Sequence, residues 1–401
     1  MTATTLEIRI AQQGAAPSLD NEIALLRRAL ERQPDSVPLL TKLSRLLNRL
    51  DRFGETIALL DGHVKDDIPL ALALMRAHLF RQEVGDASRA EALADQMLTI
   101  ANDDQTRAAL LLERGRARGQ MAGINAACAD WRAALDADPD HHIAFERLAR
   151  TYLLSGDAAA ALDLCEELRR KNIAHSSLLA MHPLALLRLG RIEEARHGFN
   201  PQQDISETIL PAPDGWNSAA AFHHQLSEEI LTHPDLRGKR LGTSSVASQR
   251  VDDLTSGQHP ALARLFAQII AEVQRQIASP ARSDAPHLAN MPKQAQFGSQ
   301  AVITGPEGHE RWHMHSHGWL SGGYYPAVPE RVSGGRDDAG CLIFGAPPEL
   351  VGQSAADALG TRVTRPLPGM LALFPSYAWH STQPHGDEAK RICIAFDIRA
   401  S

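Results

Sequence analysis

A 34-residue period in the first half of the chain restricts its fold more than any other feature. Gly156 and Gly190 are 34 residues apart, and so are Ala161 and Ala195. Over residues 20–199 apolar residues recur at intervals of three and four with few β-branched runs, a pattern typical of amphipathic helices. A fixed period in helical sequence indicates repeated hairpins, each of which buries its apolar flank only against a neighbour. We therefore expect a helical solenoid with an exposed concave groove.

One repeat is preserved well enough to suggest a family. The segment 139–168 resembles the tetratricopeptide repeat (TPR) family at five positions, Leu148, Tyr152, Gly156, Ala161 and Leu164. The Trp-Leu-Gly opening of that family is absent, and the units from Ala101 to Trp131 are degenerate. The resemblance implies four or five stacked hairpins whose groove binds a protein or peptide. The alternative is that the helices only buttress a second domain or dimerise the chain.

Length and composition indicate a two-domain globular protein. The 401 residues exceed what one compact core usually supports. A net charge of −7 argues against a nucleic-acid partner, which requires a concentrated basic face. The sequence has no apolar run of 18 residues, no signal-peptide pattern at its start, and four widely spaced cysteines that are expected to be reduced thiols. We expect a cytoplasmic protein without a membrane span; the sequence does not specify an oligomeric state.

The chain changes character after the repeats. Residues 200–215 are rich in Pro, Gln and Asp, and they predict a linker. This linker separates a TPR-like domain at 20–199 from a second domain at 216–401, and residues 1–19 are expected to form a flexible N-terminus.

The second domain is expected to combine two helices with a β-structure. Helical patterns cover residues 216–233 and 259–278. From residue 297 the hydrophobic period shifts toward two, in short stretches separated by Gly, Pro and Asp clusters. This pattern predicts a sandwich or barrel with one face covered by the helices, so the whole chain is a multidomain α + β protein.

A cluster of histidines precedes the second predicted strand. On a strand, residues two apart point to the same face about 6.6 Å apart, so His313 and His315 could bind one metal ion. A lone His-x-His pair is weak evidence, because histidine clusters on protein surfaces are common. His380 is the candidate third ligand, and it follows the punctuated stretch 366–379.

An arginine is expected beside the third histidine. The turn signal at 383–388 is centred midway between His380 and Arg391, so a simple hairpin would pair these two residues on one face. Arg391, Cys393 and Ala395 would then face the cavity, while Ile392, Ile394, Phe396 and Ile398 would form the opposite apolar face. A guanidinium in a metal cavity suits a carboxylate ligand, and a dicarboxylate could contact metal and arginine together. The alternative for Arg391 is a surface ion pair with Glu388 or Asp387.

These stretches resemble the 2-oxoglutarate- and Fe(II)-dependent oxygenases, whose fold is the double-stranded β-helix, or jelly roll. Residues 297–399 carry the resemblance, and they are most similar to a bacterial group often fused to TPR units. The resemblance implies that His313, His315 and His380 hold Fe(II) and that Arg391 grips the distal carboxylate of 2-oxoglutarate. Tyr325 matches a position that offers a hydroxyl to the cosubstrate.

Two departures from the common pattern of that superfamily concern the site. Most of its members have Asp or Glu where this chain has His315, and a serine is usual where this chain has Cys393. The resemblance also implies no catalytic residue beyond the iron site.

The resemblance implies a dioxygenase, by default a hydroxylase, acting on a protein or peptide recruited by the repeats. Two other functions stay open. A cupin-type metalloenzyme also uses His-x-His, but it usually has a Glu four or five residues later, where this chain has Trp319 and Leu320. A non-catalytic TPR scaffold with a degenerate barrel is the other alternative.

Overall fold

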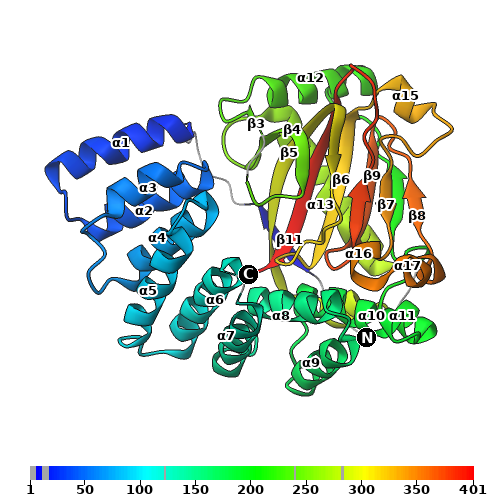
Figure 1. Ribbon diagram of the computed structural model, residues 1–401. Helices are drawn as coiled ribbons and strands as arrows, with labels where there is room; N and C mark the ends of the chain where they lie inside the picture. The colour runs from blue at the N-terminus through cyan, green and yellow to red at the C-terminus, as the bar shows by residue number, and fades with distance from the viewer. Residues whose placement is uncertain (1–5, 11–17, 122, 239–240, 281–283) are drawn as a thin grey trace.

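The computed structural model describes residues 6–10, 18–121, 123–238, 241–280 and 284–401. These residues form a helical solenoid that curves along one side and the lower end of a β-sandwich in the view of Figure 1. The helices of the solenoid are α1 (Leu19–Arg32), α2 (Val37–Arg49), α3 (Phe53–Leu60), α4 (Ile68–Arg81), α5 (Asp86–Leu98), α6 (Asp104–Gln120), α7 (Ile124–Ala137), α8 (His142–Leu154), α9 (Ala158–Arg170), α10 (Ser176–Arg188) and α11 (Ile192–Gly198).

The 34-residue period corresponds to a repeated helix hairpin, as expected. Gly156 lies in the turn between α8 and α9, and Gly190 lies in the turn between α10 and α11. Their φ angles are +83° and +75°, a left-handed conformation that only glycine adopts at little cost. The two glycines therefore mark equivalent points of successive hairpins, and the buried Ala161 and Ala195 let the second helix of each hairpin approach closely.

The second part is a sandwich of two sheets with antiparallel pairing except at one strand. The large sheet has the order β2-β9-β6-β11-β5-β4-β3, with β1 added parallel to β5, and the small sheet has the order β10-β7-β8. The strands are β1 (Glu7–Ile10), β2 (Ser206–Ile209), β3 (Arg237–Gly238), β4 (Ser245–Val251), β5 (Gln294–Glu310), β6 (Leu320–Ala327), β7 (Leu342–Phe344), β8 (Arg362–Thr364), β9 (Met370–Pro375), β10 (His380–Thr382) and β11 (Arg391–Ala400). The helices are α12 (Ala219–Leu231), α13 (Pro260–Ala278), α14 (Pro286–Ala289), α15 (Glu330–Ser333), α16 (Pro348–Val351) and α17 (Gln353–Leu359).

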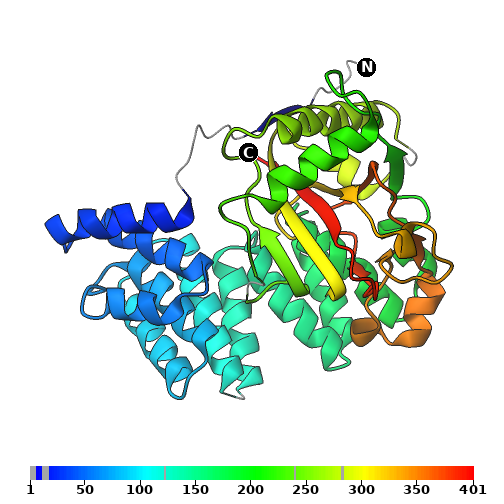
Figure 2. The same ribbon diagram turned by 90° about the horizontal axis from the view of Figure 1, so that it is seen from above.

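The predicted alternation along β11 places its apolar residues in a core. Ile392, Ile394, Phe396 and Ile398 are buried in a cluster that also contains apolar residues of α12 and α13. Figure 2 shows these two helices side by side over the sheet. Because side chains alternate along a strand, the opposite face of β11 is left for the space between the two sheets.

Two segments expected to be irregular are strands. Glu7–Ile10, inside the expected flexible N-terminus, pairs with residues 294–297 of β5, and Ser206–Ile209, inside the expected linker, pairs with β9. The expectation is wrong for these residues because an exposed sheet edge offers unpaired backbone groups that a short segment can satisfy. Four residues are too few to give a periodic signal. Residues 1–5 and 11–17 of the expected N-terminal segment lie outside the described residues.

The last repeats and the sandwich share one apolar core. Trp379, 2% exposed, packs into this core, and its Nε1 donates to the Ala180 carbonyl of α10 at 3.3 Å. The Ser176 hydroxyl at the start of α10 donates to the Gly318 carbonyl at 2.5 Å. The last repeats therefore pack directly against the sandwich. Trp319, Tyr377 and Trp379 are buried packing residues.

The cysteines and the helices bear on two other expectations. Cys128, Cys165, Cys341 and Cys393 are free thiols, as expected. Among the described residues, no helix has both the length and the apolar character that a membrane crossing requires.

Two glycines of α6 give a test of packing between α6 and α7. A Cβ at Gly115 would lie 2.5 Å from Trp131 Nε1 and 3.1 Å from the Ala127 carbonyl, whereas a Cβ at Gly119 would lie 3.7 Å from the Ala127 Cβ. We expect Gly115→Ala to lower the free energy of unfolding by about 1–3 kcal/mol, because Trp131 must move. Gly119→Ala should raise it by up to about 1 kcal/mol through helix propensity. Urea unfolding followed by circular dichroism measures both; equal effects would contradict the close contact.

Candidate active site

Three histidines from two chain segments converge between the two sheets. His313 and His315 follow the end of β5, and His380 begins β10. The backbones of His313 and His380 exchange two hydrogen bonds of 2.9 Å. The ring centroids are 4.1 Å apart for His313–His380, 5.4 Å for His313–His315 and 5.2 Å for His315–His380. One nitrogen from each ring lies within 4.8 Å of the other two, so the expected convergence is present.

Hydrogen bonds at Nδ1 determine the tautomer of all three rings. Each Nδ1 faces an oxygen that cannot donate, so in the neutral ring Nδ1 carries the proton and Nε2 keeps its lone pair. This is how histidines that bind metals are usually held. The three contacts are His313 Nδ1 to the Arg311 carbonyl at 2.8 Å, His380 Nδ1 to the Ala378 carbonyl at 2.9 Å, and His315 Nδ1 to the Asp397 carboxylate at 2.5 Å.

Burial and neighbouring charges divide the histidines into two kinds. Burial lowers the pKa of His313 to about 4, and burial together with the adjacent imidazoles holds the pKa of His380 well below its usual value. Burial acts in the same direction on His315, but the charge and hydrogen bond of Asp397 raise its pKa. Burial likewise opposes ionisation of Asp397, but His315 holds the pKa of this carboxyl well below its usual range. The cavity therefore contains two neutral imidazoles and a third that is paired with a buried carboxylate.

Arg391 is a buried guanidinium without a carboxylate partner. It is 3% exposed, and among the described residues it forms no ion pair. Its Nη1 donates to the Gly340 carbonyl at 2.5 Å and its Nη2 to the Thr382 hydroxyl at 3.4 Å, while its Nε is buried without a hydrogen-bond partner. The expected alternative, a surface ion pair with Glu388 or Asp387, is wrong. A buried positive charge with an unused donor favours an anionic ligand in the cavity.

The expected hairpin between His380 and Arg391 is wrong. His380 pairs with Phe344 in the small sheet, whereas Arg391 pairs with Thr304 in the large sheet. The turn at 383–388 carries the chain across from one sheet to the other. Both residues still line one cavity of about 380 Å³, because the two sheets face each other across it.

Tyr325 and Cys393 share the same cavity. Tyr325 on β6 is buried, and its hydroxyl lies beside the Cys393 thiol of β11. A Cβ at Gly323 would lie 3.1 Å from the Cys393 Sγ and 3.6 Å from the Tyr325 hydroxyl. Burial raises the pKa of Tyr325 well above its usual value, so this hydroxyl stays protonated and can donate a hydrogen bond. All five residues selected from the sequence therefore line one cavity.

Three further residues of the cavity were missed by the sequence analysis. Asp397 lies on the same face of β11 as Arg391, and the alternation along that strand could have identified it. Arg250 of β4, 7% exposed, donates to the Ser245 hydroxyl at 2.6 Å and to Gln300 at 2.5 Å, and both Arg250 and Gln300 line the cavity. No sequence signal indicated β4, since its seven residues mix polar and apolar side chains.

Some solved structures are similar to parts of the chain. A prolyl-4-hydroxylase from Pseudomonas putida is 16% identical over 54% of this chain and 99% of its own, with a TM-score of 0.34. A thermophilic TPR protein from Thermus thermophilus is 22% identical over 42% of this chain and 91% of its own, with a TM-score of 0.35. TM-scores below 0.5 are too low to transfer any property from these proteins. No curated protein matches the chain.

A family model matches the strands that build the cavity. Residues 299–397, about a quarter of the chain, match the family described as "Putative 2OG-Fe(II) oxygenase". The match runs from β5 to β11 and includes the three histidines, Tyr325 and Arg391. Residues 299–397 therefore resemble the 2OG-Fe(II) oxygenase family, whose metal is Fe(II) and whose cosubstrate is 2-oxoglutarate.

Proposed function

We propose that this protein is an Fe(II)- and 2-oxoglutarate-dependent hydroxylase that acts on a peptide or protein. The observation that carries the proposal is the convergence of His313, His315 and His380: each ring has its Nδ1 hydrogen-bonded, and one nitrogen of each lies within 4.8 Å of the other two. Imidazole nitrogens suit iron among the first-row metals, and three protein ligands leave positions open for other molecules.

The proposed iron ligands are three neutral imidazoles. The carboxylate ligand that is common in the superfamily is absent at position 315, but Asp397 lies directly behind His315, with its Oδ1 2.5 Å from the Nδ1 of that ring. The Ser321 hydroxyl also donates to this carboxylate at 2.7 Å. We infer that Asp397 orients His315 and increases its basicity, as outer carboxylates do at metal centres.

Arg391 is the proposed anchor for the cosubstrate. Its guanidinium is positioned by the Gly340 carbonyl and by Thr382, and it has an unused Nε donor. A distal carboxylate of 2-oxoglutarate would supply the missing anion, and burial makes this charge pair stronger than it would be in water. The Tyr325 hydroxyl is a further donor in the same cavity.

The residues of the chain bind, orient and exclude water, while the oxidising chemistry belongs to the cofactors. Bound iron with 2-oxoglutarate and dioxygen supplies the oxidant for a C–H bond. Phe374 and Leu342 form apolar parts of the cavity wall and limit its hydration. The completeness of this set favours an enzyme over a scaffold with a degenerate barrel.

Substitution of the ligands and of the anchor should separate metal binding from cosubstrate binding. We expect His313→Ala to abolish 2-oxoglutarate-dependent succinate release. Arg391→Ala should weaken 2-oxoglutarate binding by roughly 10–100-fold, because one buried charge-assisted contact is lost. The visible charge-transfer band on anaerobic titration with Fe(II) and 2-oxoglutarate measures this binding. Arg336→Ala, at an exposed position of the same domain, is the control. Unchanged turnover in His313→Ala would show that iron bound at this site is not required for the reaction.

The carboxylate behind His315 should affect the metal more than the fold. Asp397→Asn keeps the size of the side chain but removes its charge, so we expect Co(II) affinity, measured by isothermal titration calorimetry, to fall roughly 10–100-fold. Asp163→Asn, at an exposed position of α9, should leave it unchanged. Equal Co(II) affinity in Asp397→Asn and wild type would contradict the role given to Asp397.

A further inference from the structure

The cavity is bordered by loops that contact the helical repeats. Its rim includes two loops, one with Thr243 and Ser244 and the other with Ser316 and His317. The first loop touches α4, since a Cβ at Gly242 would lie 2.9 Å from Phe80 Cε1. The second touches α8, since the rings of His317 and His142 are 4.6 Å apart. Helix α6 lies between α4 and α8 in the solenoid (Figure 1).

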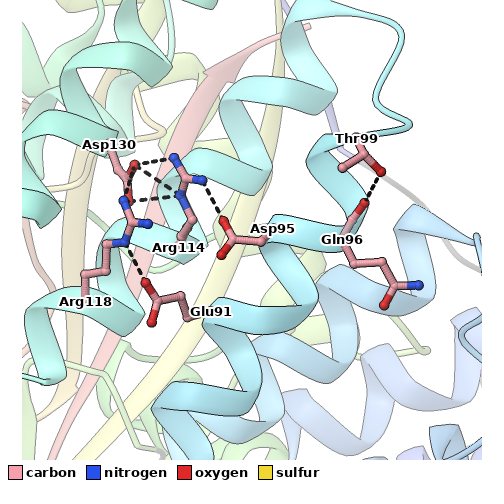
Figure 3. Close-up of polar contacts among 7 residues, drawn as sticks. All are labelled: Glu91, Asp95, Gln96, Thr99, Arg114, Arg118 and Asp130. Carbon is pink, nitrogen blue, oxygen red and sulfur yellow. Dashed lines mark hydrogen bonds and ion pairs between the residues drawn. The ribbon is translucent and has the colours of Figure 1, made fainter.

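The arginines of α6 differ in how they are neutralised. Arg114 and Arg118 lie on the side of α6 that faces α5 and α7, where Figure 3 shows them among three carboxylates. The ion pairs are Arg114–Asp130 at 2.6 Å, Arg114–Asp95 at 2.7 Å, Arg118–Glu91 at 2.8 Å and Arg118–Asp130 at 3.0 Å. The carboxylates therefore neutralise both guanidiniums, which makes these two arginines poor sites for an anionic ligand.

Arg116 lies on the other side of α6, where carboxylates are fewer. Its guanidinium carbon is 4.9 Å from the ring centroid of Phe80, the residue that touches the first loop of the mouth. Its ion pair with Glu113, at 3.0 Å, is shared with Arg76 of α4, which contacts the same carboxylate at 2.8 Å. One buried glutamate therefore balances two arginines.

Helix α8 adds two more arginines to this face. Arg147 is exposed to solvent, and its guanidinium forms neither an ion pair nor a hydrogen bond with the residues that the structure describes. The surrounding groove and the nearby charge of Arg116 both lower the pKa of Arg147. Arg150 follows one turn later, and Glu146 is the acidic residue close to both. Like charges thus gather at this face with too few carboxylates to balance them.

The four residues Arg76, Arg116, Arg147 and Arg150, here called the arginine face, oppose the charge of the whole protein. Glu113 and Glu146 neutralise part of this positive charge. The chain as a whole, in contrast, carries a formal charge of −7. A local excess of positive charge in a groove concentrates anions there. Guanidinium groups bind carboxylates bidentately, so acidic side chains suit this face.

We propose that the arginine face binds acidic residues of a peptide substrate next to the residue that enters the cavity. This inference rests on the proposed function and names the class of its substrate. Arg147 is five residues beyond His142 on α8, which corresponds to about 7.5 Å along the helix axis. An extended peptide spans this distance in two to three residues. A peptide that passes His142 at the mouth can therefore place an acidic side chain at Arg147 two to three residues further along.

Labelled peptides of alternating sequence test the charge preference. The probes are fluorescein-labelled twelve-residue peptides with the repeats Glu-Ala, Gln-Ala and Lys-Ala, and fluorescence anisotropy with the full chain measures their affinity. We expect the Glu peptide to bind at least tenfold tighter than the Gln peptide, with an affinity that falls as salt is added. Arg147→Glu should weaken the Glu peptide at least tenfold and improve binding of the Lys peptide. Arg170→Glu, at the exposed end of α9, is the matched control and should change neither.

Other outcomes would overturn the inference. Equal affinities for the Glu and Gln peptides, or an Arg147→Glu variant that binds like the wild type, would exclude a role for the arginine face. Tighter binding of a twelve-nucleotide single-stranded DNA, lost in Arg147→Glu, would identify a nucleic acid as the partner instead. The His313→Ala variant separates this inference from the proposed function, because it should lose succinate release and still bind the Glu peptide.

Discussion

Three hydrogen bonds at the Nδ1 atoms of His313, His315 and His380 determine what the cavity can bind. They fix the orientation of each ring and place its proton on the side away from the other two, so the centre of the site contains acceptors without donors. A neutral guest would leave these acceptors unsatisfied, whereas a cation satisfies all three at once. The guanidinium of Arg391 has no carboxylate partner among the described residues and favours an anion in the same cavity. A cation and an anion therefore complete the site together.

The packing of the two sheets determines the geometry of the site, because the histidines and Arg391 do not all come from one sheet. His380 belongs to the small sheet and Arg391 to the large sheet, so the distance between them depends on how the two sheets pack. The loop that follows His315 is held by the repeats through the bond from Ser176 to the Gly318 carbonyl, and Trp379 packs against α10. A site with its supporting groups locked by packing keeps its geometry without the ligand.

Local patterns in the sequence predicted the parts of this structure that local forces determine. Alternation along residues 391–398 predicted which side chains face the cavity, and the glycine spacing of 34 predicted the hairpin period. The pairing of His380 with Arg391 was predicted wrongly, because a turn signal does not reveal whether the chain stays in one sheet or crosses to another. The strands β1 and β2 were missed for a related reason, since their pairing partners lie far along the chain. The hydrogen bond from His315 to Asp397 spans 82 residues, and only the assembled sheet brings the two together.

The sandwich and the solenoid differ in the charged groups that each can hold. Burial keeps the pKa of His313 and His380 low, and the same burial makes each further unpaired charge inside the cavity costly. Guanidiniums that attract acidic side chains must instead stay accessible and unpaired, as Arg147 does. One small cavity cannot satisfy both conditions. The solenoid can satisfy the second condition, because its helices α4 and α8 contact the loops that line the cavity and also carry the accessible arginines.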